Sequence, residues 1–349
     1  MSAAEPPSRI SPSQAPSAAS PAEPPGSSGR AAPRPSAGDG APEGPRWSWP
    51  IALLLALRPR QWSKNLLLYA GFLFTLNQVW KPLQPSMWAA LLRSSLGVLL
   101  FCAVSSGVYL LNDLRDLEQD RAHPVKRHRP LARRLLPEWL AVLAAFVLLI
   151  GGVGGSWALR PLLGGVAALY IAMQVAYTLK LKHLVILDVF VIALGFVLRA
   201  ISGAIVLYAH ISPWLYIVTF LAALFLGLCK RRHELVLLNA DAVHHRRILR
   251  EYSIELLDQM ISIVTASTIM AYSLYTFKAE GLPENNLMML TIPYVLYGMF
   301  RYLYLVHKRN SGGSPEEVLL RDRPLLLAIV LWALTAATIL ALGRAPGPT

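Results

Sequence analysis

The sequence predicts an all-α, polytopic membrane protein with nine transmembrane helices. The first observation is composition, because 54% of the 349 residues are hydrophobic and only 15% are charged, which is too apolar for a soluble domain of this size. The second is a series of apolar runs that are long enough, or nearly long enough, to cross a bilayer. The third is the placement of Lys and Arg, which concentrate in alternate loops between these runs.

The amino-terminal region differs in composition from the rest of the chain. Residues 1–46 are dominated by Pro, Ala, Ser and Gly and contain no apolar core, so we expect a disordered cytoplasmic tail. This tail lacks the basic start and apolar centre of a signal peptide. The membrane domain is expected over 47–345, and any catalytic site should lie within it.

The membrane domain is expected to begin with an interfacial amphipathic segment at about 47–63. A first span at about 65–78 follows it. The later apolar runs predict spans at about 87–111, 138–158, 161–179, 184–207, 212–229, 255–277, 284–305 and 323–343. Four spans separate the two largest polar loops, and this spacing predicts an arrangement of two four-helix halves.

The loops between these spans differ sharply in positive charge. Eighteen Lys and Arg residues lie in 112–137, 180–183, 230–254 and 306–322, against three in 79–86, 159–160, 208–211 and 278–283. This bias predicts that the amino terminus and all the basic loops are cytoplasmic, and that the carboxyl terminus lies outside. The formal net charge of +13 follows from topology and anionic ligands, so nucleic acid is not expected as a partner. Cys102 and Cys229 lie inside apolar runs and are expected to be core residues.

The stretch that suggests chemistry is NDLRDLEQDRAHPVKRHRP, from Asn112 to Pro130, directly after an apolar run. If the helix continues past that run, Asp113, Asp116 and Asp120 fall on one of its faces, and Asn112 falls close to the same face. Three carboxylates on one face repel each other unless a cation lies between them. A hard cation such as Mg²⁺, shared with substrate phosphates, would suit these four residues as ligands.

Basic residues follow the carboxylates within the same stretch. Lys126, Arg127 and Arg129 are suited to holding the phosphate oxygens of a metal-bound polyphosphate. Helix capping is the alternative for Asn112, and ordinary positive-inside charge is the alternative for the basic loop. The complete acid–base block at the end of a span favours function, since ionisable residues there are costly.

Three further polar clusters are candidates for substrate contact, each with a structural alternative. Lys230, Arg231, Arg232 and Glu234 follow a span and could contact phosphate or ribose, or could be solvated loop residues. Lys180 lies at a cytoplasmic mouth, while Asp188 and Arg199 are eleven residues apart on one helix face and should point into the bundle, to bind substrate or to form structural ion pairs. Arg58 and Lys64 precede the first span and would suit a lipid phosphate or simple interfacial anchoring.

These residues carry a resemblance to a known family. NDLRDLEQD at the end of the second span resembles the first aspartate-rich motif of the UbiA superfamily of membrane prenyltransferases, which are bundles of nine helices in two halves. The closer similarity is to the branch of decaprenyl-phosphate phosphoribosyltransferases. The similar stretches are LRPRQWSKN (57–65), SSGVYLLNDLRDLEQDRAHPVKRHRP (105–130), LDVFVIALGFVLRAISGA (187–204), KRRHEL (230–235) and SPEEVLLRDRPL (314–325). The chain departs from ordinary prenyltransferases because KRRHE and a lone Asp241 stand where those carry a second DxxxD motif.

The resemblance implies transfer of 5-phosphoribose from 5-phosphoribosyl 1-diphosphate (PRPP) to a polyprenyl phosphate, with release of pyrophosphate and a requirement for Mg²⁺. It gives Asp113, Asp116 and Asp120 the catalytic role, in a plasma-membrane enzyme that faces the cytoplasm and supplies arabinose donors for cell-wall arabinogalactan. A homo-oligomer is possible. The alternatives are a prenyltransferase that moves a prenyl diphosphate onto an aromatic acceptor, and an anion or lipid carrier.

Overall fold

A computed structural model describes residues 49–123, 126–210, 212–237, 247–279, 282–283, 285–309, 313 and 315–343. The chain divides into two units, Met1–Pro45 and Arg46–Thr349. The predicted disordered tail therefore lies outside the described residues. Within those residues the all-α prediction is confirmed, because there is no strand and the only β-type pairing is an isolated bridge between Leu76 and Trp80.

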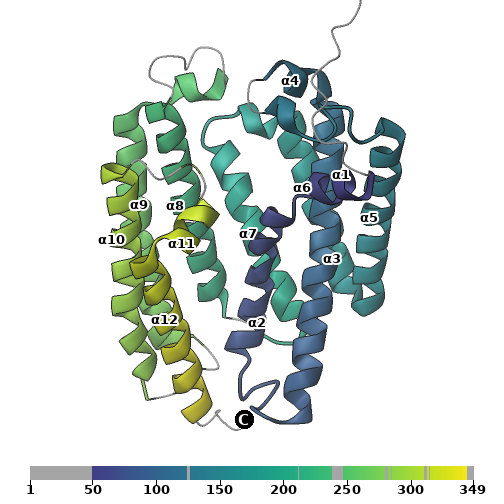
Figure 1. The fold of residues 1–349 in the computed structure, drawn as a ribbon. Coiled ribbons are helices and arrows are strands. Elements are labelled where there is room, and N and C mark those ends of the chain that lie inside the picture. Colours follow the sequence, from purple (N-terminus) through teal and green to yellow (C-terminus); the bar gives the residue numbers. More distant parts are fainter. Residues whose placement is uncertain are drawn as a thin grey trace, which may run out of the picture. The chain divides into compact units, whose positions relative to one another are not determined.

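The second unit is built from α-helices joined by short 3₁₀ helices, written η (Figure 1). The α-helices are α1 (Trp49–Ala56), α2 (Tyr69–Phe74), α3 (Pro85–Arg115), α4 (Leu117–Ala122), α5 (Glu138–Leu159), α6 (Pro161–Leu179), α7 (Leu187–Val206), α8 (Pro213–Leu237), α9 (Ile254–Lys278), α10 (Ile292–Lys308), α11 (Pro315–Arg321) and α12 (Arg323–Leu342). The 3₁₀ helices are η1 (Pro59–Leu68), η2 (Lys126–His128), η3 (Leu181–His183), η4 (Arg247–Glu251) and η5 (Leu287–Thr291).

Eight helices among the described residues are long and apolar enough to cross a membrane, so the predicted count of nine is not confirmed. They correspond to the predicted spans from 87–111 onward. The predicted first span at 65–78 is instead the end of η1 followed by the short α2. A 3₁₀ helix rises about 2.0 Å per residue, so η1 and α2 together rise about 29 Å, close to the roughly 30 Å of a hydrocarbon core.

The interfacial segment also differs from the prediction of an amphipathic helix. Its helical part, α1, has the sequence WPIALLLA and is apolar on all sides. Ala52 and Ala56 are buried, whereas Trp49, Ile51 and Leu54 are exposed. Alanines allow α1 to lie close against its neighbours, and the large apolar side chains point away from them.

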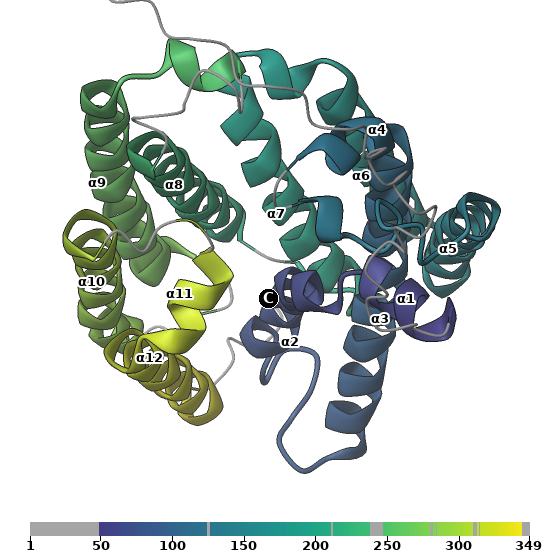
Figure 2. The same ribbon diagram turned by 45° about the horizontal axis from the view of Figure 1, so that its top comes forward.

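The long helices pack mainly against their neighbours in the sequence: α3 on α5, α5 on α6, α6 on α7, α7 on α8, and α8 on α9, while α10 packs on α12 (Figures 1 and 2). The segment η1–α2 packs against both α3 and α7. Glycine makes the contact with α7 close, because a Cβ on Gly203 would lie 2.1 Å from the carbonyl oxygen of Leu68. Small residues at helix contacts are the usual means by which membrane helices approach.

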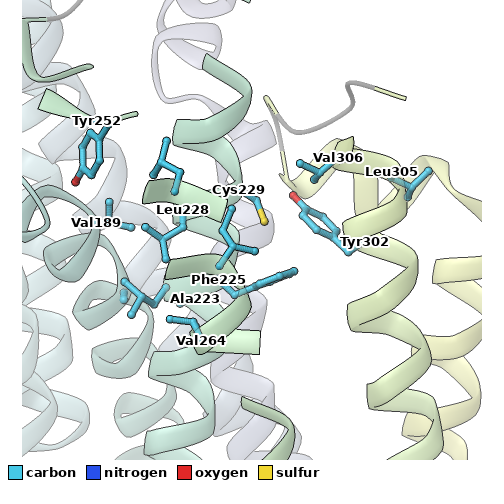
Figure 3. Close-up of a cluster of buried hydrophobic side chains, with 14 of the residues drawn as sticks. Val189, Ala223, Phe225, Leu228, Cys229, Tyr252, Val264, Tyr302, Leu305 and Val306 are labelled. Carbon is cyan, nitrogen blue, oxygen red and sulfur yellow. The ribbon is translucent and has the colours of Figure 1, made fainter. Parts of the chain in front are cut away.

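Apolar clusters lie on both sides of α7. One contains Phe101, Leu163 and Tyr170 from α3 and α6. The other, drawn in Figure 3, gathers residues of α7, α8, α9 and α10, including Phe225 and Tyr302, whose ring centres are 5.4 Å apart. Cys229 lies in this second cluster, and Cys102 is also buried and free, so the prediction that both cysteines are core residues is confirmed.

Candidate active site

The aspartates of the NDLRDLEQD stretch lie at a break between two helices. Helix α3 ends at Arg115, and α4 begins at Leu117, so the expected continuous helix does not form. On an unbroken helix, Asp113 and Asp120 would be separated by about 10.5 Å along the axis. Instead, one guanidinium nitrogen of Arg129 donates to both carboxylates, at 3.0 Å from Oδ1 of Asp113 and in a short contact with Oδ2 of Asp120. The break therefore brings these two aspartates around one cation.

Further basic side chains complete this group, which we call the Asp113–Asp120 centre. Arg58 donates to Asp113, and Nζ of Lys126 lies 3.8 Å from Oδ1 of Asp120. Asp113 and Asp120 are only 3% and 2% exposed, whereas the side chains of Arg58 and Arg129 are 27% and 29% exposed. The carboxylates are thus covered by cations that reach the surface.

Arg58 is held in a strained backbone conformation. Its φ of 56° is left-handed, which is uncommon for residues other than glycine. Its guanidinium carbon lies 4.9 Å from the centre of the Tyr109 ring, and its Nη2 contacts Asp113. Such strain persists where the surroundings determine the conformation, as they do at functional sites.

The remaining predicted metal ligands are placed differently from Asp113 and Asp120. Oδ1 of Asn112 accepts a hydrogen bond of 3.0 Å from Thr178 on α6. Asp116 is half-buried at the helix break, and its carboxylate has no hydrogen bond or ion pair within the described ranges. In the part of the chain that the structure describes, no three His, Cys, Asp or Glu side chains are grouped as a metal site. The two carboxylates that share Arg129 nevertheless fit a divalent cation, since a positive charge already lies between them.

Asp188 and Arg231 belong to a second, separate network. Asp188 is fully buried and accepts from Nε of Arg231 at 2.8 Å and from the hydroxyl of Tyr252 at 2.9 Å. Arg231 also donates to Glu234, and the Tyr252 hydroxyl accepts from the backbone N–H of Ile186 at 2.7 Å. The network ties the start of α7 to the end of α8 and to the segment before α9. This arrangement favours the structural alternative for Asp188 and Arg231.

Replacing Tyr252 with Phe is expected to make the stability of the protein less dependent on pH in the alkaline range. Burial raises the pKa of Tyr252 from 10.0 to about 12, and its hydrogen bond to Asp188 acts in the same direction. Because the pKa is raised in the folded protein, the neutral hydroxyl contributes its full stability below pH 10 and loses it as the pH rises to about 12. Thermal midpoints of both proteins across this range would test the prediction, and parallel curves would contradict it.

The other predicted basic residues fall into three groups. Arg232 is engaged elsewhere, because its Nε donates to Asp258 on α9 at 2.5 Å, and Asp258 also contacts His307 on α10. Arg127 and Lys180 are exposed and have no side-chain partner among the residues that the structure describes. Lys64 and Lys230 are half-buried, and each interacts with neighbouring groups. Arg127 and Lys180 are therefore the basic side chains most available to a ligand.

Arg199 is buried among neutral groups within the membrane region. It donates to Asn65 Oδ1, Gly195 O and Tyr170 Oη, each at 2.8 Å, and its guanidinium carbon lies 4.8 Å from the Tyr170 ring centre. Only 4% of Arg199 is exposed. No carboxylate is paired with it in the described part of the chain. Its contacts join α7 to η1 and α6, which again favours a structural role.

Replacing Arg199 with Lys is expected to lower the free energy of unfolding by about 1–3 kcal/mol, because one ammonium group cannot reach three acceptors on different segments. Thermal unfolding of the purified protein in detergent would measure this loss. Activity per folded molecule should be unchanged. A higher KM for the substrates at normal stability would instead support the substrate-binding alternative.

The structure also identifies contacts that sequence reasoning missed. Tyr109 supports Arg58, Thr178 holds Asn112, and Tyr252 completes the Asp188 network. Only Tyr109 had a local signal, since it lies four residues before Asp113 and so on the same face of α3. Thr178 and Tyr252 come from distant segments, and no spacing in the sequence indicates their partners.

Comparisons with known proteins agree with this architecture. The UbiA prenyltransferase family matches residues 72–320. Decaprenyl-phosphate phosphoribosyltransferase of Mycobacterium tuberculosis (strain CDC 1551 / Oshkosh) is 33% identical over 288 residues, covering 82% of this chain and 94% of the relative. The protein of the same name from Mycolicibacterium smegmatis is 33% identical over 300 residues, covering 83% of this chain and 92% of the relative.

A solved structure has the same fold. The UbiA homolog from Archaeoglobus fulgidus bound to GPP and Mg²⁺ superposes with a TM-score of 0.64 at 18% identity, covering 83% of this chain and 100% of that chain. The eight long apolar helices and this likeness identify an integral membrane protein. With the family match over 72–320 and relatives 33% identical over most of their length, the chain belongs to the UbiA prenyltransferase family.

Proposed function

We propose that this protein transfers 5-phosphoribose from PRPP to the phosphate of a polyprenyl phosphate and releases pyrophosphate. The observation that carries the proposal is the Asp113–Asp120 centre, two buried carboxylates beneath three basic side chains at the end of a membrane helix. The alignment of this chain with a decaprenyl-phosphate phosphoribosyltransferase, which covers 94% of that relative's length, supports this choice within the family. An enzyme of this class must hold a soluble, highly anionic donor beside a lipid acceptor.

The reaction breaks the bond between C1 of ribose and the diphosphate oxygen and forms a bond from C1 to an oxygen of the lipid phosphate. Negative charge develops on the leaving pyrophosphate. Mg²⁺ held by Asp113, Asp116 and Asp120, with Asn112 beside them, would supply electrostatic stabilisation of that charge. The lipid phosphate is already anionic, so the protein needs no general base. Orientation of donor and acceptor by the chain's own residues then accounts for much of the rate.

The basic residues of the centre have two tasks in this proposal. In the free protein, Arg58 and Arg129 neutralise the buried carboxylates. Because their side chains are partly exposed, both can turn toward diphosphate oxygens when the donor arrives, and guanidinium groups match those oxygens well. Arg129 must leave Asp113 and Asp120 before these carboxylates can hold a metal ion. Binding of metal and diphosphate is therefore expected to be mutually dependent.

Topology supports the orientation of the site. The loops at the same end of the helices as Asp113 carry 18 Lys and Arg residues, against three at the other end, so this end faces the cytoplasm of a plasma-membrane enzyme. PRPP would then reach the site from the cytoplasm, and the polyprenyl chain would lie in the bilayer. Lys126, Arg127 and Lys180 are our candidates for binding the donor's 5-phosphate or the lipid phosphate. Lys64 and Lys230, which belong to the motifs LRPRQWSKN and KRRHEL, are further candidates.

Radiolabelled PRPP, polyprenyl phosphate and Mg²⁺ incubated with the purified protein should give label that partitions into an organic phase. The label should be absent when a chelator is added or when the lipid is left out. A parallel reaction with a prenyl diphosphate and aromatic acceptors tests the family's other chemistry. Consumption of the prenyl diphosphate there, without labelled lipid in the first reaction, would replace the proposal with prenyl transfer.

A further inference from the structure

Two arginines meet one tyrosine at the end of the helices opposite to the Asp113–Asp120 centre. Arg93 is on α3, twenty residues before Asp113, which corresponds to about 30 Å along the helix. Arg160 lies between α5 and α6, and Tyr208 follows α7. The guanidinium carbons of Arg93 and Arg160 lie 5.7 Å and 4.0 Å from the centre of the Tyr208 ring. Three segments far apart in the sequence thus converge here.

No carboxylate of the described residues balances these charges. Every described Asp and Glu lies at the end of the helices that holds the Asp113–Asp120 centre. These residues are in α4, η4 or α11, in the loops at that end, or in the terminal turns of the long helices there. Arg160 donates from Nη1 to the carbonyl of Ile205, and Arg93 has only its contact with the Tyr208 ring within the described ranges. Two like charges beside one ring repel each other, so an anion bound there would be stabilised by both.

The depth of the cluster matches the headgroup region of a membrane. Trp88 on α3 and Trp157 on α5 are 61% and 58% exposed, and each lies within five residues of one of the arginines. Exposed Trp residues mark the boundary between hydrocarbon and water. Tyr208 is also exposed and has a left-handed φ of 58°, a conformation that is costly for an aromatic residue. The strained turn holds its ring beside both arginines at this boundary.

We propose that Arg93, Arg160 and Tyr208 form a binding site for the phosphate of an anionic phospholipid in the leaflet away from the active site. Guanidinium groups bind phosphate oxygens through paired N–H donors, and two arginines at headgroup depth would give an anionic lipid phosphate more than one such contact. The bound lipid would connect α3, the α5–α6 turn and the end of α7. It would stabilise the fold without taking part in the transfer reaction.

Thermal unfolding of the full chain in an uncharged detergent tests this site. Phosphatidylglycerol should raise the midpoint of the wild-type protein more than an equal mole fraction of phosphatidylcholine does. Arg93→Gln should bind phosphatidylglycerol about five-fold more weakly. The difference in midpoint between the two lipids should therefore be much smaller for this variant than for the wild type. Because Arg93 is exposed, the midpoint of this variant in phosphatidylcholine should equal that of the wild type.

Lys81→Gln is the matched control, since it removes one exposed positive charge from the same end without a contact to Tyr208. Equal losses in Arg93→Gln and Lys81→Gln would overturn the site in favour of general charge attraction. Equal effects of the two lipids on the wild type would also overturn it. If sn-glycerol 3-phosphate alone reproduces the stabilisation, the ligand is a soluble phosphate and the assignment to lipid is wrong.

Discussion

Replacing Asp116 with Asn should reduce phosphoribosyl transfer by at least about a hundredfold, the scale expected when a group that supports transition-state charge is removed. Asp116 lies at the junction of α3 and α4, between Asp113 and Asp120 in the sequence. Its carboxylate has no ion pair in the described part of the chain, so it can hold a metal ion without displacing an arginine. The substitution keeps the shape of the side chain and changes only its charge.

Stability provides the control for this prediction. Because the Asp116 side chain makes no hydrogen bond or ion pair among the described residues, the thermal midpoint of Asp116→Asn should match that of the wild type. Asp113→Asn should differ, since it also removes the partner of Arg58 and Arg129 and should lower the midpoint. Binding of Mn²⁺ in the presence of pyrophosphate, followed by electron paramagnetic resonance, gives a readout besides activity. Full activity and normal Mn²⁺ binding in Asp116→Asn would exclude Asp116 as a ligand.

Features that depend on residues close together in the chain could be predicted from the sequence, whereas features that depend on distant residues could not. Apolar runs predicted the long helices because each run must cover the thickness of a bilayer by itself. The segment 65–78 differs from the predicted single span because it joins the end of a 3₁₀ helix to the short α2, and neither piece is long enough to give a periodic signal. The helix break at Asp116 was missed for a similar reason, since no Pro or Gly marks it.

The candidate site shows the same division. Asp113, Asp120, Lys126 and Arg129 are close in the sequence, and the structure brings them together as one group. Asp188 and Arg199 were selected because ionisable residues in a membrane helix are costly, and Arg231 because it belongs to a basic cluster that follows a span. Neither criterion distinguishes substrate contacts from structural pairs. Their partners, Tyr252, Tyr170 and Asn65, come from other elements. Only the packed structure shows that these residues are already satisfied.

Replacing Arg129 with Gln should expose the repulsion that this arginine relieves in the free protein. Asp113 and Asp120 are almost fully buried and share one of its guanidinium nitrogens. Breaking a buried pair typically costs 3–5 kcal/mol, and since Arg129 is partly exposed we expect a loss of about 2 kcal/mol in unfolding free energy. Transfer should also fall, with a higher KM for PRPP, because the contact that we propose between Arg129 and the diphosphate is lost.

Mg²⁺ alone should distinguish this variant from the wild type. In the wild-type protein Arg129 competes for the carboxylates, so Mg²⁺ without diphosphate should change the thermal midpoint little. In Arg129→Gln the two carboxylates no longer share a cation, so Mg²⁺ can take the place of Arg129 and should restore much of the lost stability through linkage. Arg127→Gln, an exposed neighbour in the same loop, should show neither the loss nor the rescue. If Mg²⁺ stabilises the wild type and Arg129→Gln equally, Arg129 does not compete with the metal, and the mutual dependence of metal and diphosphate binding fails with it.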